Sequence, residues 1–118
     1  MDEKMISDLR MKSGAHWKKI VEKYGSNGKD TVMDYKDFLQ GRQAASVTLH
    51  GCSVELPVHR QNFIEFIYAY EGRIVTEIDG KELVQKKGDI LLMNQYVEHR
   101  VKPTGNENEA LILAALPD

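Results

Sequence analysis

The chain has 118 residues, of which 42% are hydrophobic and 29% are charged, and its formal net charge at pH 7 is −2. This size predicts one domain with a real core and excludes two substantial ones. Lysine and arginine form no basic stripe, which excludes an electrostatic footprint for nucleic acid. No signal peptide and no apolar run long enough to cross a bilayer are found, so we expect a cytoplasmic protein without a membrane partner. The single cysteine fits this expectation, because it cannot form an internal disulfide.

The N-terminal segment is predicted to be helical. Residues 2–24 carry apolar side chains at helical spacing, which we interpret as a packing surface: Trp17, Ile20, Val21 and Tyr24. Two helices that divide at Ser13-Gly14, with Ser13 as the cap of the second, are the alternative. The sequence GSNGKD at 25–30 is expected to end the helix, because glycine and asparagine accept a left-handed conformation. A short second helix is expected at 32–40.

Residues 44–118 consist of short runs of strand-forming residues separated by turn sequences. The predicted strands are 46–56, 63–70, 73–78, 81–85, 90–93, 97–101 and 110–116. Asp79-Gly80 lies between two of them and predicts a type I′ hairpin, which needs positive φ at both positions. Many short antiparallel strands indicate a small barrel or a jelly roll. We therefore divide the chain into an N-terminal helical segment, 1–43, that packs on a barrel formed by 44–118.

One strand carries polar side chains on a face that should point into the core. Alternation places a mixed row on one face and a fully apolar row on the other: His59, Gln61, Phe63, Glu65, Ile67 and Ala69 against Ile64, Phe66, Tyr68 and Tyr70. A strand with two apolar faces is expected to be covered by the barrel interior on one side and by a helix or a partner on the other. A buried carboxylate at Glu65 is costly unless it is paired. The polar row is therefore predicted to line a pocket.

These residues resemble two known motifs. The pattern His59-x-Gln61-x3-Glu65-x6-Gly72 resembles the first motif of the cupins, with glutamine in place of the second histidine. The run GDILLMNQYVEHRVKP at 88–103 resembles the second motif, with Tyr96 in place of a glycine and His99 at the histidine that binds metal. The resemblance implies a mainly β fold, a cupin-like double-stranded β-helix (jelly-roll) barrel with one or two N-terminal helices.

The order of shorter features is similar to that in the N-terminal cupin-type sensor domain of AraC-like transcriptional regulators. An F-x-E strand, a glycine turn, a D-G-K hairpin, a K-G-D turn and a late V-x-H follow one another over 63–101. This resemblance implies a bacterial domain that binds a small-molecule effector and forms a homodimer. It would contact DNA only through a C-terminal domain that is absent from this chain, which we therefore expect to be a fragment.

The resemblance implies an effector site near His59, Gln61, Glu65 and His99. Imidazole and carboxylate groups suit divalent transition metals, so His59, Glu65 and His99 are also candidate metal ligands. Sensor cupins of this type commonly work without metal, and Gln61 is a weaker donor than imidazole. We therefore predict no cofactor and a hydrogen-bonded polar cluster that orients an effector.

Two other functions are compatible with the sequence. One is a small metal-dependent cupin enzyme, a dioxygenase or an isomerase, and the other is a stand-alone ligand-binding cupin. We predict a non-enzyme, because the sequence offers no nucleophile with a base and no phosphate-binding glycine loop. His16 and His50 stand alone in the sequence and are expected to be structural or exposed, while Cys52 is expected to be a small buried hydrophobe.

Overall fold

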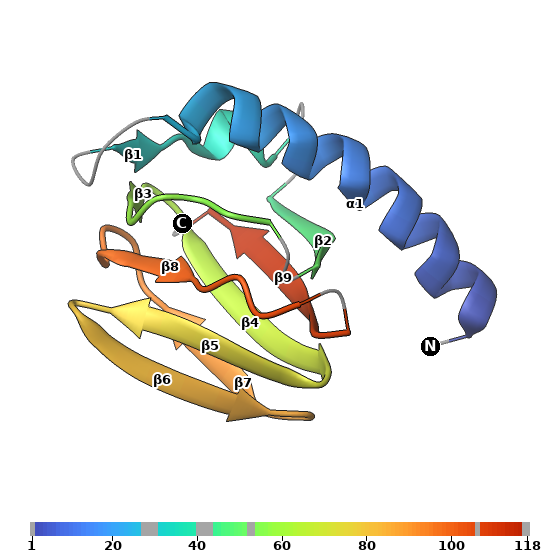
Figure 1. Cartoon of the computed structure of the whole chain (residues 1–118). Helices are drawn as coiled ribbons and strands as arrows, with labels where there is room; N and C mark the ends of the chain where they lie inside the picture. Colours follow the sequence, from blue (N-terminus) through green and yellow to red (C-terminus); the bar gives the residue numbers. More distant parts are fainter. Residues whose placement is uncertain (1, 27–30, 40–43, 52–53, 106, 117–118) are drawn as a thin grey trace.

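The computed structural model describes residues 2–26, 31–39, 44–51, 54–105 and 107–116 (Figure 1). One long helix precedes nine strands and a single 3₁₀ turn within these ranges. The elements are α1 (Glu3–Tyr24), β1 (Val32–Met33), η1 (Tyr35–Asp37), β2 (Ala45–Gly51), β3 (Arg60–Gln61), β4 (Ile64–Glu71), β5 (Arg73–Ile78), β6 (Lys81–Lys86), β7 (Ile90–Met93), β8 (His99–Val101) and β9 (Glu109–Ala115). The mainly β fold with an N-terminal helix is confirmed. Cys52 lies outside the described residues, and its expected burial stays a prediction.

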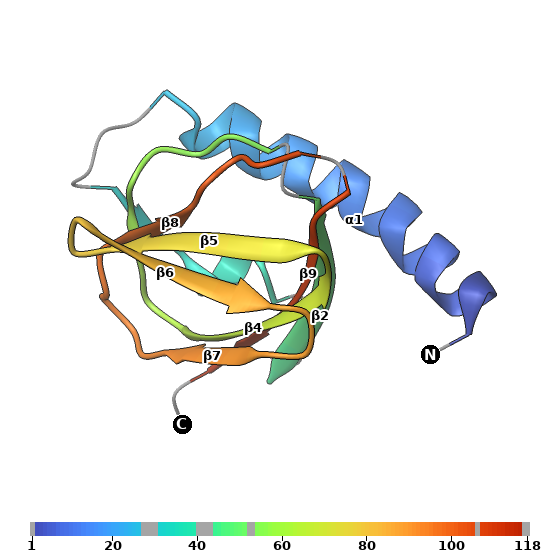
Figure 2. The same ribbon diagram turned by 60° about the horizontal axis from the view of Figure 1, so that its bottom comes forward.

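Two antiparallel sheets form the barrel. Strands pair in the order β2-β9-β4-β7 in one sheet and β6-β5-β8 in the other, while β1 and β3 form a short parallel pair. Figure 2 shows the two sheets enclosing an interior, with α1 along the side of β2. Inward-facing side chains from both sheets make the core: Phe63, Ile67, Ala69, Ile74, Met93, Val101, Ala110, Ile112 and Ala114. Among the described residues, no helix is both long and apolar enough to cross a membrane.

The turns between the strands follow the sequence closely. Asp79 and Gly80 have φ angles of 49° and 82°, which confirms the type I′ turn between β5 and β6. At the next turn back, Gly72 has a φ of 70°, and a Cβ atom there would run into the side chain of Asn108. The Oδ1 atom of Asn108 accepts a hydrogen bond of 2.9 Å from the backbone N–H of Arg73. The glycine of the first motif therefore lets Asn108 approach and fix the start of β5.

Helix α1 is one continuous helix, so the alternative of two helices divided at Ser13-Gly14 is wrong. Asp2 caps its N-terminus, and its carboxylate accepts a hydrogen bond of 2.8 Å from the backbone N–H of Met5. Ser13 caps nothing, and its Oγ atom instead accepts a hydrogen bond of 2.7 Å from the backbone N–H of Leu49 on β2. At the C-terminus, Gly25 is right-handed, with a φ of −62°, and not left-handed as expected. The rest of the predicted stop signal, 27–30, lies outside the described residues.

Of the short helix expected at 32–40, the structure shows only the 3₁₀ turn η1, because the first residues of this segment pair with the barrel. Val32 and Met33 lie parallel to Arg60 and Gln61 as β1 and β3. The 3₁₀ turn η1 follows, capped by the carboxylate of Asp34, which accepts a hydrogen bond of 2.9 Å from the backbone N–H of Lys36. Pairing with a strand from the barrel thus overrides the weak local helical preference.

Candidate functional site

Four polar side chains converge inside the barrel. His59, Gln61, Glu65 and His99 come from three neighbouring segments, and between 1% and 5% of each residue is exposed. Gln61 ends β3, Glu65 lies on β4 and His99 begins β8. His59 pairs with His99 through two backbone hydrogen bonds of 3.0 and 2.9 Å. This pairing sets the two imidazole rings side by side, with centroids 4.6 Å apart.

Both histidines are held in one orientation by their own strands. The Nδ1 atom of His59 lies 2.8 Å from the carbonyl oxygen of Pro57, and that of His99 lies 2.8 Å from the carbonyl oxygen of Val97. We assign Nδ1–H as the donor in each ring, which leaves the Nε2 lone pairs free. Burial, together with the charge of His99, lowers the pKa of His59 to about 4, and burial also lowers the pKa of His99. Both rings are therefore neutral at pH 7.

Glu65 sits between the amide of Gln61 and the ring of His99. Its Oε2 atom accepts a hydrogen bond of 3.1 Å from Gln61 Nε2, and its Oε1 atom lies 4.0 Å from His99 Nε2. Complete burial raises the pKa of Glu65, although the Gln61 hydrogen bond and the charge of His59 oppose this shift. Because His99 is neutral, its contact with Glu65 is a polar contact and not an ion pair.

The cluster does not make a closed metal centre as it is folded. Two imidazoles, a carboxylate and an amide are a donor set that a divalent transition metal accepts. Ligands about 2.1 Å from one ion lie at most about 4 Å apart, so Glu65 and His99 stand at the limit of that range. Within the described ranges, no three histidine, cysteine, aspartate or glutamate side chains gather closely enough to hold an ion. The arrangement is therefore a buried, hydrogen-bonded polar cluster.

A fifth polar residue, His50 on β2, also lines this interior. Only 2% of it is exposed, and neither ring nitrogen has a hydrogen-bond partner among the residues that the structure describes. Burial and the charge of His59 lower its pKa to about 4. The sequence predicts only that His50 is structural or exposed, and it does not predict that His50 lies beside this cluster. The alternation of residues in β2 predicts the wrong inward face. Its apolar residues are Val47 and Leu49, but the side chain of His50, on the opposite face of the strand, is the one that points into the barrel.

Little space is left around the cluster. The interior cavity beside it has a volume of about 20 Å³, which is room for roughly one water molecule. Two aromatic side chains from the N-terminal segment close it, Trp17 from α1 and Phe38 after η1, with ring centroids 6.0 Å apart. The ring of Phe38 also lies 4.7 Å from that of Phe63 in the core. As folded, the barrel interior has no room for an organic effector.

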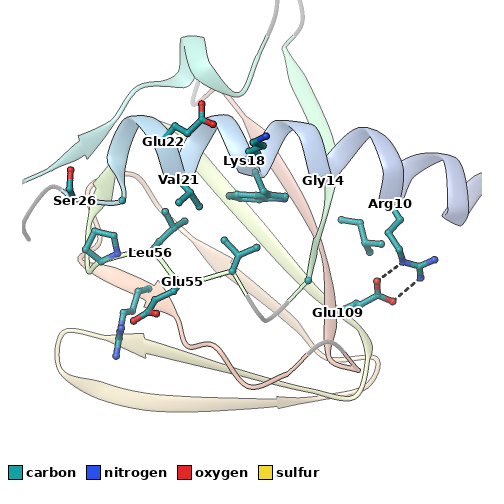
Figure 3. A pocket seen from close by; sticks show the side chains of 16 residues that line it. Arg10, Gly14, Lys18, Val21, Glu22, Ser26, Glu55, Leu56 and Glu109 are labelled. Atoms are coloured by element: carbon teal, nitrogen blue, oxygen red, sulfur yellow. Dashed lines mark hydrogen bonds and ion pairs between the residues drawn. The ribbon is translucent and has the colours of Figure 1, made fainter.

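A much larger groove runs between α1 and the rim of the barrel. Its volume is about 1390 Å³, and Figure 3 shows side chains from the helix on one side and from residues 54–57 on the other. The lining combines apolar and charged side chains: Trp17, Val21, Leu49, Val54, Leu56 and Pro57, with Arg10, Lys18, Glu22, Glu55, Arg100 and Glu109. At one end, Arg10 makes a two-pronged ion pair with Glu109, with distances of 2.7 and 2.9 Å. Trp17 lines both the groove and the interior cavity, so it forms the wall between them.

Comparison with known proteins agrees with this architecture. The family model described as Cupin domain matches residues 46–116, which is more than half of the chain. The chain belongs to the cupin family. Its seven-strand barrel is accordingly a cupin double-stranded β-helix, and the predicted fold class is confirmed.

Several solved structures superpose on this barrel. Protein NMB1881 from Neisseria meningitidis is 17% identical with a TM-score of 0.54, covering 64% of this chain and 77% of that one. A predicted oxalate decarboxylase from Thermotoga maritima is 23% identical with a TM-score of 0.50, covering 61% and 64%. An RmlC-like cupin from Methanocaldococcus jannaschii is 15% identical with a TM-score of 0.51, covering 61% and 68%. The comparison with curated proteins finds no match. At these identities the likeness concerns the fold alone.

Proposed function

We propose that this cupin domain is the effector-binding and dimerisation domain of an AraC-type bacterial transcription regulator and that it acts in the cytoplasm. The observation that carries ligand binding is the groove of about 1390 Å³ whose inner wall is Trp17. Its volume is above the 300–1,000 Å³ typical of small-molecule sites, so a ligand has room, and its lining of apolar side chains with several charged groups suits such a ligand. The effector would therefore bind beside α1, with the polar cluster behind Trp17.

The position of the groove suggests how binding could be transmitted. A ligand between α1 and the barrel rim would contact the helix directly, and it can shift only an equilibrium between states that it binds differently. Helix α1 contacts the barrel through Ser13 and Trp17. A small displacement of the helix at the groove would therefore move the whole helix relative to the barrel. Regulation would then consist of a change in the position of α1 that alters how a DNA-binding domain elsewhere in the protein is held.

A catalytic role is the less favoured proposal. The polar cluster of His59, Gln61, Glu65 and His99 is the chemically richest part of the molecule, but Trp17 and Phe38 close it. A substrate would need a candidate acid or base within about 3 Å of its reacting atoms, and the cavity of about 20 Å³ admits none. This favours a sensor, or a stand-alone ligand-binding cupin, over an enzyme.

Trp17 is the single tryptophan of the chain, so its fluorescence reports on the groove without any label. Titration with a library of bacterial metabolites should identify compounds that change its emission, and calorimetry should confirm each one. Val21→Arg places a charge in the groove and should abolish binding of those compounds. Met11→Arg is the matched control, because Met11 is 76% exposed on the same helix and does not line the groove. Ligands that bind equally well to both variants would contradict the groove as the site.

The regulatory part of the proposal has its own test in the gene. Coding sequence for two helix-turn-helix motifs beyond residue 118 would support the AraC-type assignment, whereas a stop codon would favour a stand-alone cupin. Residues 1–118 alone should not retard DNA selectively at physiological salt, because residues 41–118 hold eight basic and eleven acidic side chains. Sequence-selective retardation would show that the DNA contact has been misplaced.

A further inference from the structure

The groove beside α1 is long and follows the helix axis. The residues of α1 that line it follow one another at three- and four-residue spacings from Arg10 to Gly25, so they share one face of the helix. Over this stretch the helix rises about 22 Å. Figure 3 shows the ion pair of Arg10 and Glu109 at one end of the groove and Ser26 at the other. A ligand that contacts the whole wall must therefore be elongated.

Two glycines keep the groove open within its length. Gly14 on α1 and Gly51 on β2 both line it, and a Cβ atom added at either would meet no atom of the described residues within 4 Å. Val21 points across the groove toward Leu56 (Figure 3), and 37% of Val21 is exposed. The groove thus offers free space at the glycines and an apolar surface at Val21. A chain of methylene groups suits both, because it is narrow and has no polar group that needs a partner.

A peptide is a poor occupant of this groove. An extended peptide binds a sheet edge through the free backbone N–H and C=O groups of the edge strand. Two residues of the edge strand β2 line the groove, and both already use one of these groups. The N–H of Leu49 donates to Ser13 Oγ at 2.7 Å. The C=O of Gly51 accepts from the N–H of Val54 at 3.1 Å. Peptide amides here would lose water without gaining backbone partners, at a cost that a hydrocarbon chain does not carry.

We propose that the occupant of this groove is an uncharged lipid with one long, unbranched alkyl chain and a small polar head group. The inference rests on the proposed function, since it names the chemical class of ligand for the groove that we assign to the effector. Burial of the chain would supply the binding free energy, because each methylene group removed from water contributes a similar increment. Affinity should then grow with chain length until the groove is filled.

The charges of the lining favour an uncharged head group. Three basic and three acidic residues line the groove, so the lining carries no net charge. Arg10 pairs with Glu109 at 2.7 Å. Lys18 lies one helical turn from Glu22, so opposite charges stand side by side there. The third basic residue, Arg100, lies 3.5 Å from a carboxylate of β5. A charged head group would have to compete with these neighbours, whereas an alcohol or ester needs only hydrogen bonds, which water can supply.

A series of n-alkanols from hexanol to dodecanol tests the chain. Binding is followed by the fluorescence of Trp17 and by calorimetry. We expect the dissociation constant to fall about tenfold for every two methylene groups added. A dissociation constant that stops falling beyond hexanol would overturn the long chain. Dodecanoate and dodecylammonium test the head group, and both should bind more weakly than dodecanol. Tighter binding of either one would overturn the uncharged head group.

Gly14→Leu tests whether the chain binds in the groove. The added side chain fills the open space at residue 14, and leucine favours the helix more than glycine does, so the fold should be kept. We expect the dissociation constant for dodecanol to rise about 30-fold or more, because leucine displaces about three methylene groups of the chain. Ala15→Leu is the matched control, because Ala15 is exposed on the same helix and does not line the groove. Dodecanol that binds equally well to both variants would overturn the inference.

This inference and the proposed function fail in different ways. A compound from the metabolite library that Val21→Arg excludes, together with alkanols that do not bind, would overturn the alkyl ligand and keep the groove as the effector site. If no compound distinguishes the wild-type chain from Val21→Arg, both proposals are overturned. Alkanol binding that Gly14→Leu and Val21→Arg both weaken would support both.

Discussion

The ring of Trp17 on α1 meets the ring of His50 on β2 edge to face, with centroids 4.6 Å apart. Both residues are almost fully buried, at 5% and 2% exposure, and within the described part of the chain neither the indole N–H nor either imidazole nitrogen has a hydrogen-bond partner. The contact joins the helix to the barrel through an aromatic pair whose polar atoms are uncompensated. Such groups lower stability unless a ligand or water supplies the missing partners.

His50 should make the protein sensitive to acid. Its folded pKa of about 4 lies below the ordinary 6.5, so the unfolded chain takes up the proton first as the pH falls. The stability that depends on neutral His50 is complete above pH 6.5 and is lost between pH 6.5 and 4. In His50→Leu, the loss of unfolding free energy between pH 7.5 and pH 5 should shrink by about 2 kcal/mol. Urea denaturation at the two pH values measures this, and an unchanged difference would mean that His50 is solvated.

The buried hydrogen bond between Ser13 and the backbone of β2 should contribute measurably to the free energy of unfolding. Ser13→Ala leaves the backbone N–H of Leu49 without a partner, at a cost of about 1–3 kcal/mol, which the better helix propensity of alanine offsets by about 0.5 kcal/mol. Ser7→Ala on the exposed side of the same helix is the control and should be neutral or slightly stabilising. Chemical denaturation measures both variants. Equal stability of the two would show that Ser13 does not fasten the helix.

Tyr96 should carry backbone strain. Its φ of 65° lies in the left-handed region, and its N–H donates a hydrogen bond of 2.8 Å to the carbonyl oxygen of Gln61, which fixes that conformation. Tyr96→Gly and Tyr96→Ala lose the same exposed ring, but only glycine relieves the strain. The glycine variant should be more stable than the alanine variant by about 1 kcal/mol in denaturant unfolding. The reverse order would mean that the loop rearranges.

The purified protein should contain substoichiometric metal. Burial raises the pKa of Glu65, which opposes the ionised carboxylate that a metal needs, and the Gln61 amide donates a hydrogen bond to that carboxyl group. A metal would have to displace that hydrogen bond and keep Glu65 ionised. Elemental analysis by mass spectrometry is the measurement. A full equivalent that disappears in His99→Ala would overturn this prediction and favour the metal-dependent enzyme.

The sequence correctly predicts the turns and strands whose local residue pattern agrees with the way they pack in the folded chain. The turn at Asp79-Gly80 and the strands 73–78 and 90–93 are correct to the residue, because turn chemistry and alternation act together there. The convergence of Glu65 with His99 follows from the two motifs and needs no knowledge of register. Local signals are sufficient for these features.

The remaining features depend on contacts between distant segments. No local signal near residues 32–33 predicts their pairing with residues 60–61, so the sequence alone favours a helix there. Along β2 the apolar residues Val47 and Leu49 suggest an inward face, and only pairing with β9 shows that His50 faces inward. The closure of the barrel by Trp17 and Phe38 is likewise a property of tertiary packing.

The position of α1 also bears on how the chain avoids aggregation. β2 is an edge strand, and an edge strand offers free backbone groups to which strands of other molecules can add without limit. Ser13 occupies one of those groups at Leu49, and the helix lies along the same side. The opposite edge of this sheet, β7, has only four residues. A chain shortened to begin after Tyr24 would therefore expose the edge of β2 and form fibrous assemblies more readily. The helix thus protects the protein against aggregation through this edge.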